Sequence, residues 1–501
     1  MHANTLRVLA VAVSGVALGL TGAEVSGATT VASLAAKAPS WVTSRSVPVP
    51  GATLWVSRYN GPANGNDFAT SVAMSPRGGE IFVTGDSSGK TSRSDFLTIA
   101  YNAVTGARLW ASRYNGPASG NDYDSSLAVS PNGSMVFVTG RSRGAGSADD
   151  YATVAYRAAT GAQVWVSRYN GPASGNDGAS SVAVSPSGGA VYVTGESIGQ
   201  TSANDYATVA YDAATGTRLW VKRYNGPANR GDLAKSVAVG PGGAVFVTGR
   251  SIGRSSGMDY ATVAYNGATG ARLWVSRYNS PANRFDGAQF VAVGPGGGKV
   301  FVTGESIGRT SGDDYATVAY SAATGARVWV KRYNGPSNRD DVANSIAVSP
   351  GGGTVLVTGT SNSVGLDIFD AQGPGAAAVP TPDYATVAYR ASTGARLWAS
   401  RYDGPGHGLD FAYSVAIGPN GRRAFVTGFS IVAGSGADYA TIAYNTASGA
   451  QVWVRRYSGP AKRSDAGSDL TVSPRGSRVF VTGTSTGTTS GQDFATIAYH
   501  S

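Results

Sequence analysis

The sequence predicts an all-β protein that forms a single β-propeller of eight four-stranded blades. One unit of about 55 residues recurs eight times between Gly51 and the last residue. The composition agrees, because 70 glycines and a charged fraction of only 14% suit short strands joined by tight turns. Glycine at this frequency disfavours helices, in which each one costs about 1 kcal/mol.

The repeat is most visible in its tryptophans. Successive members are 54 or 55 residues apart, except for one step of 69 residues. The column consists of Trp55, Trp110, Trp165, Trp220, Trp274, Trp329, Trp398 and Trp453. A period of about 55 residues is too long for the common helical repeats and is typical of a propeller blade.

Each unit contains four strand-like segments rich in β-branched and aromatic residues. In the third unit they are 181–184, 190–194, 205–211 and 218–224. A Pro-x-Gly turn such as Pro186–Gly188 separates the first two segments, and Thr215-Gly216 separates the last two. Proline presets φ and glycine supplies a positive φ, so both connections are expected to be tight turns.

The ends of the repeat array predict how the ring closes. The first recognisable segment, Leu54–Tyr59, has the pattern of a fourth strand, and the last, Asp493–Tyr499, that of a third strand. We therefore expect residues 53–59 to be the outer strand of the blade that contains residues 467–499. This pairing would leave no sheet edge exposed at the chain ends.

The N-terminal region resembles an export signal. Arg7 precedes an apolar stretch, Val8–Leu20, which is too short to span a bilayer comfortably and is followed by small residues. We expect a signal peptide over 1–28, a flexible lead-in over 29–50 and the propeller over 51–501. The protein is then secreted or at the cell surface, without a membrane span in the mature chain; an uncleaved anchor is the alternative.

Several kinds of chemistry are disfavoured by composition. The absence of cysteine excludes disulfides, thiolate metal sites and thiol nucleophiles. Only three histidines occur, His2, His407 and His500, so a multi-histidine metal site is not expected. The net charge of +10 suits anionic partners, but no Lys/Arg run or nucleic-acid motif is present, and we predict no nucleic-acid partner.

Three charged columns recur in all eight units. An arginine lies three residues after each tryptophan, one aspartate opens each first strand, and another opens each third strand; Arg223, Asp177 and Asp205 are examples. Eight carboxylate sites, for calcium for example, are one interpretation. We favour a structural one, in which each guanidinium bridges aspartates of its own or an adjacent blade.

The segment Ala210–Trp220, with the pattern Ala-Tyr-x-x-x-Thr-Gly-x-x-Leu/Val-Trp, resembles the repeat of the quinoprotein-dehydrogenase-like propellers. The resemblance covers residues 51–501 and implies eight blades locked by glycine and tryptophan. Enzymes of that family that use pyrroloquinoline quinone typically have an adjacent cysteine pair and a calcium site beside a catalytic aspartate. This chain has no cysteine, and none of its aspartates stands apart from the columns as a clear match to that catalytic aspartate. We therefore predict no catalytic residue, metal or cofactor; the quinone with calcium is the alternative.

A ligand site is expected where the copies differ. The fourth-to-first and second-to-third connections are longer and vary between copies, and they should share one end of the ring. Three residues after the first-strand aspartate, Thr70, Ser125, Ser180 and Ser468 contrast with larger groups in units four to seven. The predicted ligand contacts are Lys235, Gln289, Asn344 and Tyr413, bordered by Arg230, Arg284 and Arg339.

The sequence favours a monomeric, non-enzymatic binding or scaffold protein over an enzyme. Its partner would be an extracellular polymer, glycan or protein held at the loop-rich end. An enzyme that uses the central funnel, either a quinone-dependent dehydrogenase or a carboxylate-based lyase or hydrolase, is the alternative. The insertion over 360–382 in unit six is either a tolerated surface loop or a lid or partner-contact loop.

Overall fold

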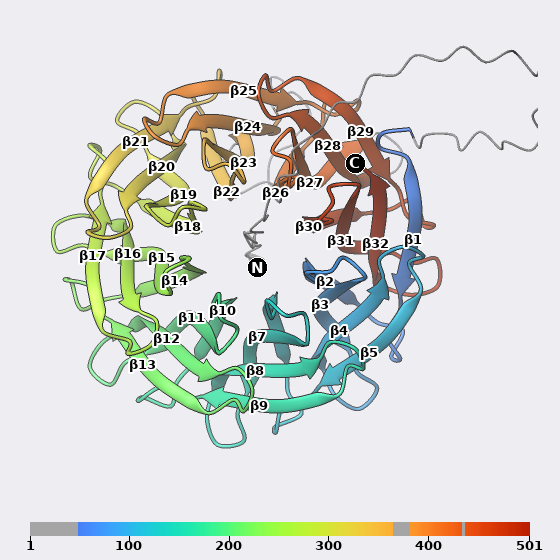
Figure 1. Cartoon of the computed structure of the whole chain (residues 1–501), viewed down its shortest axis with the longest axis horizontal. Coiled ribbons are helices and arrows are strands. Elements are labelled where there is room, and N and C mark those ends of the chain that lie inside the picture. Colours follow the sequence, from blue (N-terminus) through green and yellow to red (C-terminus); the bar gives the residue numbers. More distant parts are fainter. Residues whose placement is uncertain (1–48, 364–380, 433–435) are drawn as a thin grey trace, which may run out of the picture.

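A computed structural model describes residues 49–363, 381–432 and 436–501. In this part of the chain, 32 strands form eight antiparallel sheets of four strands each, arranged as blades around a common centre (Figure 1). The eight-bladed fold is thus confirmed. The predicted signal peptide, nearly all of the lead-in and most of the insertion lie outside the described residues. No helix capable of crossing a membrane is found among the described residues.

Within each blade the first strand is innermost and the fourth is outermost (Figure 1). The first strands are β2 (Asp67–Met74), β6 (Asp122–Val129), β10 (Asp177–Val184), β14 (Asp232–Val239), β18 (Asp286–Val293), β22 (Asp340–Val348), β26 (Asp410–Ile417) and β30 (Asp465–Val472). The second strands are β3 (Glu80–Ser88), β7 (Met135–Arg143), β11 (Ala190–Ile198), β15 (Ala244–Ile252), β19 (Lys299–Ile307), β23 (Thr354–Ser363), β27 (Arg423–Val432) and β31 (Arg478–Thr486).

The two outer positions repeat in the same way. The third strands are β4 (Ser94–Asn102), β8 (Asp149–Arg157), β12 (Asn204–Asp212), β16 (Met258–Asn266), β20 (Asp313–Ser321), β24 (Asp383–Arg390), β28 (Gly436–Asn445) and β32 (Gln492–His500). The fourth strands are β5 (Arg108–Tyr114), β9 (Gln163–Tyr169), β13 (Arg218–Tyr224), β17 (Arg272–Tyr278), β21 (Arg327–Tyr333), β25 (Arg396–Tyr402), β29 (Gln451–Tyr457) and β1 (Thr53–Tyr59). Blades are numbered 1 to 8 from β2.

The outer strand of blade 8 is the first strand of the chain. β1 pairs antiparallel with β32, with Trp55 opposite Ala498 and Arg58 opposite Ala495. The backbone N–H of Gly51 adds a hydrogen bond of 2.7 Å to the carbonyl of His500. Segments from the two ends of the repeat array therefore share one sheet.

Each tryptophan packs on the turn glycine of the next blade. Trp165 is almost fully buried, and its indole N–H donates to the Ala213 carbonyl in the next blade at 3.0 Å. A Cβ on Gly216, whose φ is +73°, would lie 2.6 Å from this indole. Glycine is therefore required at this position for two reasons, the positive φ of the turn and the close approach of the indole. The same contact occurs at all eight junctions, including Trp453 with Gly51.

The arginine column binds the third-strand aspartates. Arg223 donates to Asp205 Oδ2 at 2.8 Å in its own blade and to the Tyr169 hydroxyl at 3.1 Å in the preceding blade. Equivalent ion pairs occur in seven of the eight blades. A half-buried guanidinium thus links two blades.

The first-strand aspartates have a different partner from the one expected. Each accepts a hydrogen bond from the backbone N–H six residues earlier, as between Gly171 and Asp177 at 2.5 Å. This bond holds the fourth-to-first connection against the start of the inner strand. The expectation that the arginine forks pair with both aspartate columns is therefore wrong for this one. In blades 1 and 5 a second-strand serine lies between the two groups: Ser87 and Ser306 accept from the arginine and donate to the first-strand aspartate.

Candidate functional site

The inner strand of every blade contains a β-bulge. In β18 the register shifts between Ala288 and Phe290, which leaves Gln289 as the extra residue. The same shift occurs in the other seven inner strands, and the bulged residues are Thr70, Ser125, Ser180, Lys235, Gln289, Asn344, Tyr413 and Ser468. All eight are half-buried. The positions that the sequence comparison selected are thus bulges, which re-aim side chains and often adjoin functional sites.

Polar and charged groups gather around the bulge of blade 5. The Gln289 amide donates to Glu305 Oε1 at 3.4 Å across β18 and β19. Gly287, which has no side chain, lies directly opposite Glu305 on β18. From blade 4, the Arg250 guanidinium lies 5.9 Å from the centre of the Phe285 ring. Arg250 Nε is buried without a hydrogen-bond partner among the described residues.

Two further carboxylates extend this cluster toward blade 6. Asp340, at the start of β22, accepts a hydrogen bond of 3.0 Å from the backbone N–H of Asp313. Burial and the nearby charge of Asp340 together raise the pKa of Asp313 to about 6, against the opposing charge of the exposed Arg284. We call Arg250, Phe285, Gln289, Glu305, Asp313 and Asp340 the blade 4–6 cluster.

Glu305 is the group of this cluster that titrates nearest neutrality. Burial raises its pKa to about 7, and the charge of Asp313 acts in the same direction. Arg250 and the hydrogen bond from Gln289 oppose the shift. The cluster therefore contains acids that change protonation near neutral pH beside a guanidinium, so it can both donate and accept hydrogen bonds.

A second pair of acids lies between blades 1 and 2. Asp86 Oδ1 accepts from the backbone N–H of Asp124 at 3.0 Å, and the bulged Thr70 donates to Asp124 Oδ2 at 2.8 Å. Burial raises the pKa of Asp124 to about 6. It also raises the pKa of Asp86, and the neighbouring Asp124 charge adds to that shift. The two carboxyls thus favour a state in which they share a proton.

The structure places the remaining predicted contacts around blades 4 to 7. The Asn344 amide donates to the Ala412 carbonyl in blade 7 at 2.9 Å. The Tyr413 ring packs 5.8 Å from Phe429, and burial raises the pKa of its hydroxyl to about 12. Lys235 occupies the half-buried bulge of blade 4. Arg230 is exposed and Arg339 is half-buried, both in the fourth-to-first connections.

Two of the seven predicted contacts lie at the carboxyls of the blade 4–6 cluster. Gln289 donates a hydrogen bond to Glu305, and the charge of Arg284 lowers the pKa of Asp313. The comparison of the eight repeat copies did not identify Arg250, Glu305, Asp313 and Asp340. For Arg250 and Glu305 a signal was nevertheless present, because the residue after the second-strand glycine also differs between copies. In order from blade 1, this position is Asp86, Arg141, Glu196, Arg250, Glu305, Thr360, Phe429 and Thr484.

One acidic group at the loop end lies between blades 6 and 7. Carboxylate oxygens of Asp383, Asp403 and Asp410 lie within 4.8 Å of one another. Each aspartate already has a protein partner. Arg401 lies 2.5 Å from Asp383, His407 is 2.6 Å from Asp403, and a backbone N–H donates to Asp410. The hydrogen bond that His407 donates to the Asp403 carboxylate raises the pKa of His407.

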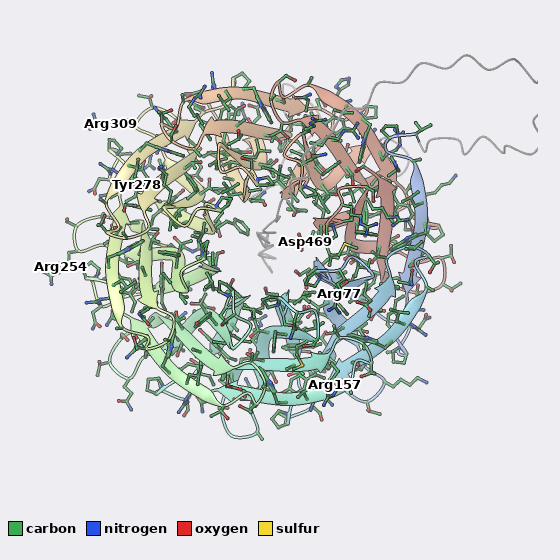
Figure 2. The ribbon with its side chains drawn as sticks, viewed as in Figure 1. Arg77, Arg157, Arg254, Tyr278, Arg309 and Asp469 are labelled. Carbon is green, nitrogen blue, oxygen red and sulfur yellow. The ribbon has the colours of Figure 1, made fainter. Side chains whose placement is uncertain are left out.

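The residues at the ring centre do not fit the quinone that the family resemblance raises as an alternative. The sequence contains no cysteine pair. Asp469 is labelled near the ring centre in Figure 2. It is buried and accepts hydrogen bonds from Ser414 on one side and from the backbone N–H of Val72 on the other. Asp124 accepts from Thr70 and lies against Asp86. These carboxylates already accept hydrogen bonds from residues of neighbouring blades, so we derive no chemistry through a quinone or calcium.

Comparisons with known proteins agree with the fold. A family model of PQQ-type repeats, described as outer membrane protein assembly factor BamB, matches residues 40–208 and 205–386. No curated protein sequence matches the chain. Sqt1 of Chaetomium thermophilum, solved bound to the N-terminus of ribosomal protein L10, has a similar structure. It is 12% identical with a TM-score of 0.58, and the match covers 90% of this chain and all of Sqt1.

Quinohemoprotein alcohol dehydrogenase from Comamonas testosteroni is 13% identical with a TM-score of 0.54, over 89% of this chain and 76% of the enzyme. BamB from Moraxella catarrhalis is 14% identical with a TM-score of 0.46, over 90% of this chain and all of BamB. At these identities Sqt1 and the dehydrogenase, whose TM-scores exceed 0.5, show a shared fold and no more. The matched repeats extend over more than half of the chain. The chain therefore belongs to the BamB-type family of PQQ-repeat propellers.

Proposed function

We propose that the protein is a secreted or cell-surface binding scaffold that holds an extracellular polymer or protein at its loop-rich end, without catalysis. The observation that carries this proposal is the departure of blades 4 to 7 from the repeat at one structural position. Every blade has a bulge there, yet only these four blades place a large polar or aromatic side chain on it.

The chemistry of the blade 4–6 cluster suits a neutral or partly charged polar ligand. Arg250 and Gln289 supply donors, while Glu305 and Asp313 accept hydrogen bonds or, when protonated, donate them. Phe285 offers a half-buried aromatic ring beside them. A hydroxyl-rich glycan or a polar peptide segment could use both kinds of contact.

The family assignment supports a binding function. BamB is described as an assembly factor, and Sqt1 was solved bound to the N-terminus of another protein. The same fold also includes a quinohemoprotein dehydrogenase. The residues at the centre of this ring do not supply the quinone site that such an enzyme needs, so binding is the better supported function.

The test begins with screening the mature protein against glycan, cell-wall and peptide arrays. With a ligand identified, Lys235→Ala, Gln289→Ala and Tyr413→Ala should each weaken binding about tenfold or more. Ser125→Ala and Ser180→Ala change the same bulge position in blades 2 and 3 and should leave the affinity unchanged. Equal effects in the two groups would refute the site.

A separate assay tests the absence of catalysis. The protein is incubated with pyrroloquinoline quinone, calcium and an alcohol, and the reduction of a redox dye is followed. We expect no turnover above the protein-free control. Turnover that depends on the quinone would show that the protein is an enzyme, whatever else it binds.

A further inference from the structure

The net positive charge of the protein is concentrated at one end of the ring. This end, here the turn end, comprises the two tight turns of each blade and the strand residue on either side of each turn. It carries 13 basic residues and only two acidic ones, Glu80 and Asp212. The basic residues are Arg77, Arg108, Arg157, Arg218, Arg272, Lys299, Arg327, Arg390, Arg396, Arg422, Arg423, Arg475 and Arg478.

The rest of the described chain is nearly neutral, with 24 basic and 25 acidic residues. Its arginines include the column that pairs with the third-strand aspartates. At the turn end, by contrast, none of the 13 basic side chains forms an ion pair within the part of the chain that the structure describes. Ten of them are exposed. The formal charge of +10 is thus available at one surface.

Apolar side chains accompany these cations. The residue before each tryptophan is a leucine or valine, adjacent to a turn, and these side chains are 37–50% exposed. They are Leu54, Leu109, Val164, Leu219, Leu273, Val328, Leu397 and Val452. In five blades this residue directly follows an exposed arginine, as in Arg218-Leu219. Exposed apolar residues arranged in this regular way are characteristic of a contact surface.

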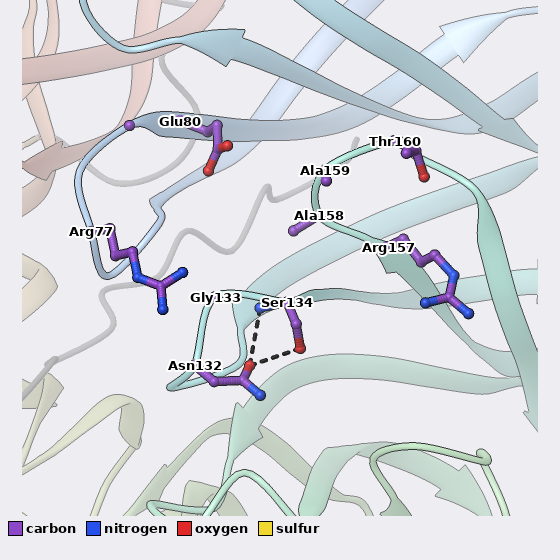
Figure 3. Close-up of a pocket in the computed structure, with 10 residues that line it drawn as sticks. Arg77, Glu80, Asn132, Gly133, Ser134, Arg157, Ala158, Ala159 and Thr160 are labelled. Atoms are coloured by element: carbon purple, nitrogen blue, oxygen red, sulfur yellow. Dashed lines mark hydrogen bonds between the residues drawn. The ribbon is translucent and has the colours of Figure 1, made fainter.

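The cations are spread around the whole ring. Every blade contributes at least one, and the ring symmetry brings all eight pairs of turns to the same end. Arg77 and Arg157, labelled on the ring in Figure 2, also border a shallow depression of about 580 Å³ between blades 1 and 2 (Figure 3). In Figure 3 their guanidinium groups lie on opposite sides of this depression.

We propose that the turn end is a docking surface for a membrane rich in anionic phospholipids. Its cations come from all eight blades, so a planar partner can contact them together, whereas a linear polyanion would reach only a few. The neighbouring leucines and valines suit the headgroup and acyl-chain boundary and would gain little from a fully hydrophilic polymer. Guanidinium groups, twelve of the thirteen cations, bind phosphate through paired hydrogen bonds.

The path of the chain is consistent with this orientation. The first described residues lie at the turn end, where Arg455 donates to the carbonyls of Pro50 and Gly51 at 3.2 and 2.8 Å. The loop-rich end, with the blade 4–6 cluster, is the opposite end of the ring. A protein docked by its turns would therefore keep the proposed ligand site directed away from the bilayer.

The proposal is tested by sedimentation with vesicles of phosphatidylcholine alone or mixed with phosphatidylglycerol. We expect binding to the mixed vesicles only, weakened by added salt. Replacing Arg390, Arg396, Arg422 and Arg423 by Gln should reduce the apparent affinity by about tenfold or more. The matched variant replaces Lys90, Arg93, Arg143 and Arg463, four cations of the loop-rich end, and should bind as the wild type does.

A second pair of measurements separates a membrane from other anionic partners. Leu219→Ser with Leu273→Ser should weaken vesicle binding without changing the binding of soluble polyphosphate. Thermal melting of each variant confirms that the ring is folded. Equal loss in both charge variants, or binding of polyphosphate without binding of mixed vesicles, would overturn the proposal. Neither outcome bears on the loop-end site, which has its own variants.

Discussion

Asp469 Oδ2 accepts a hydrogen bond of 3.0 Å from the backbone N–H of Val72, which joins the last blade to the first. Six of the other seven blades have serine at the position of Asp469. Ser181, for example, accepts from the backbone N–H of Val237 in the next blade at 2.9 Å. Asp469 thus performs the serine's role at the closing junction, and its other oxygen accepts from Ser414 at 2.8 Å.

This relationship predicts different effects for two substitutions. Asp469→Ala should destabilise the protein by about 1–3 kcal/mol, because the buried N–H of Val72 loses its acceptor. Asp469→Ser should stay closer to the wild type, since serine makes the equivalent bond elsewhere in the ring. Urea unfolding curves measure both changes, and equal destabilisation by the two variants would contradict the assigned role.

The arginine column gives a second prediction. Arg223→Ala should lower the free energy of unfolding by about 1–3 kcal/mol, because Asp205 and the Tyr169 hydroxyl lose a half-buried partner. Arg218→Ala, on the same strand but exposed, is the control and should change stability by less than about 0.5 kcal/mol. An unchanged melting temperature for Arg223→Ala would show that the column is not structural.

Alanine substitutions at two turn glycines distinguish the cost of backbone strain from the cost of a steric clash. Gly216 and Gly243 both have positive φ, but only Gly216 would bring a Cβ against an indole, 2.6 Å from Trp165. Gly243→Ala should therefore cost about 1–2 kcal/mol through strain alone. Gly216→Ala should cost clearly more, because Trp165 must move. The melting temperatures of the two variants test this prediction. Similar decreases in both would mean that Trp165 and Gly216 can accommodate the added methyl group without further cost.

Glu305 should make stability depend on pH. Its pKa is raised from 4.5 to about 7 in the folded protein, so the folded state holds this proton more tightly than the unfolded chain. Its favourable contribution is present below pH 4.5 and is lost as the pH rises to about 7. Glu305→Gln should thus stabilise the protein at pH 8 by about 1–2 kcal/mol, and by much less at acidic pH.

The matched control for this prediction is Glu196→Gln in blade 3. Glu196 occupies the same position and also lies opposite a glycine, Gly178, but it has no neighbour equivalent to Asp313. Melting curves of both variants and the wild type from pH 4 to about 8 cover the range in which Glu305 titrates. The same pH profile for Glu305→Gln as for the wild type would show that Glu305 is ionised throughout this range.

The number of blades and the position of each turn could be predicted from sequence because every feature is repeated eight times. A single proline or glycine is a weak signal, whereas Pro-x-Gly at one place in all eight units leaves little ambiguity. The partner of the first-strand aspartate could not be predicted in this way. A backbone N–H group is invisible in a pattern of side chains, and it is this group that Asp177 binds.

The candidate site was only partly predictable for a related reason. Comparison of the copies at one column identified Gln289, and the carboxyl it contacts lies on the adjacent strand, 16 residues later. Which columns meet depends on strand register, and the raised pKa of Glu305 depends on burial that the fold creates. The ring also packs Tyr413 against Phe429, a contact between two strands that neither residue indicates alone.

The pairing of β1 with β32 has a consequence for how the protein is made. β1 can find its hydrogen-bonding partner only after β32 has been synthesised. Arg58 and its partner Asp493 are separated by 435 residues. At a synthesis rate of roughly 5–20 residues per second, the first strand waits on the order of 20–90 s. Until then the growing chain is an open arc of blades with two exposed sheet edges, so the ring can close only after β32 has emerged.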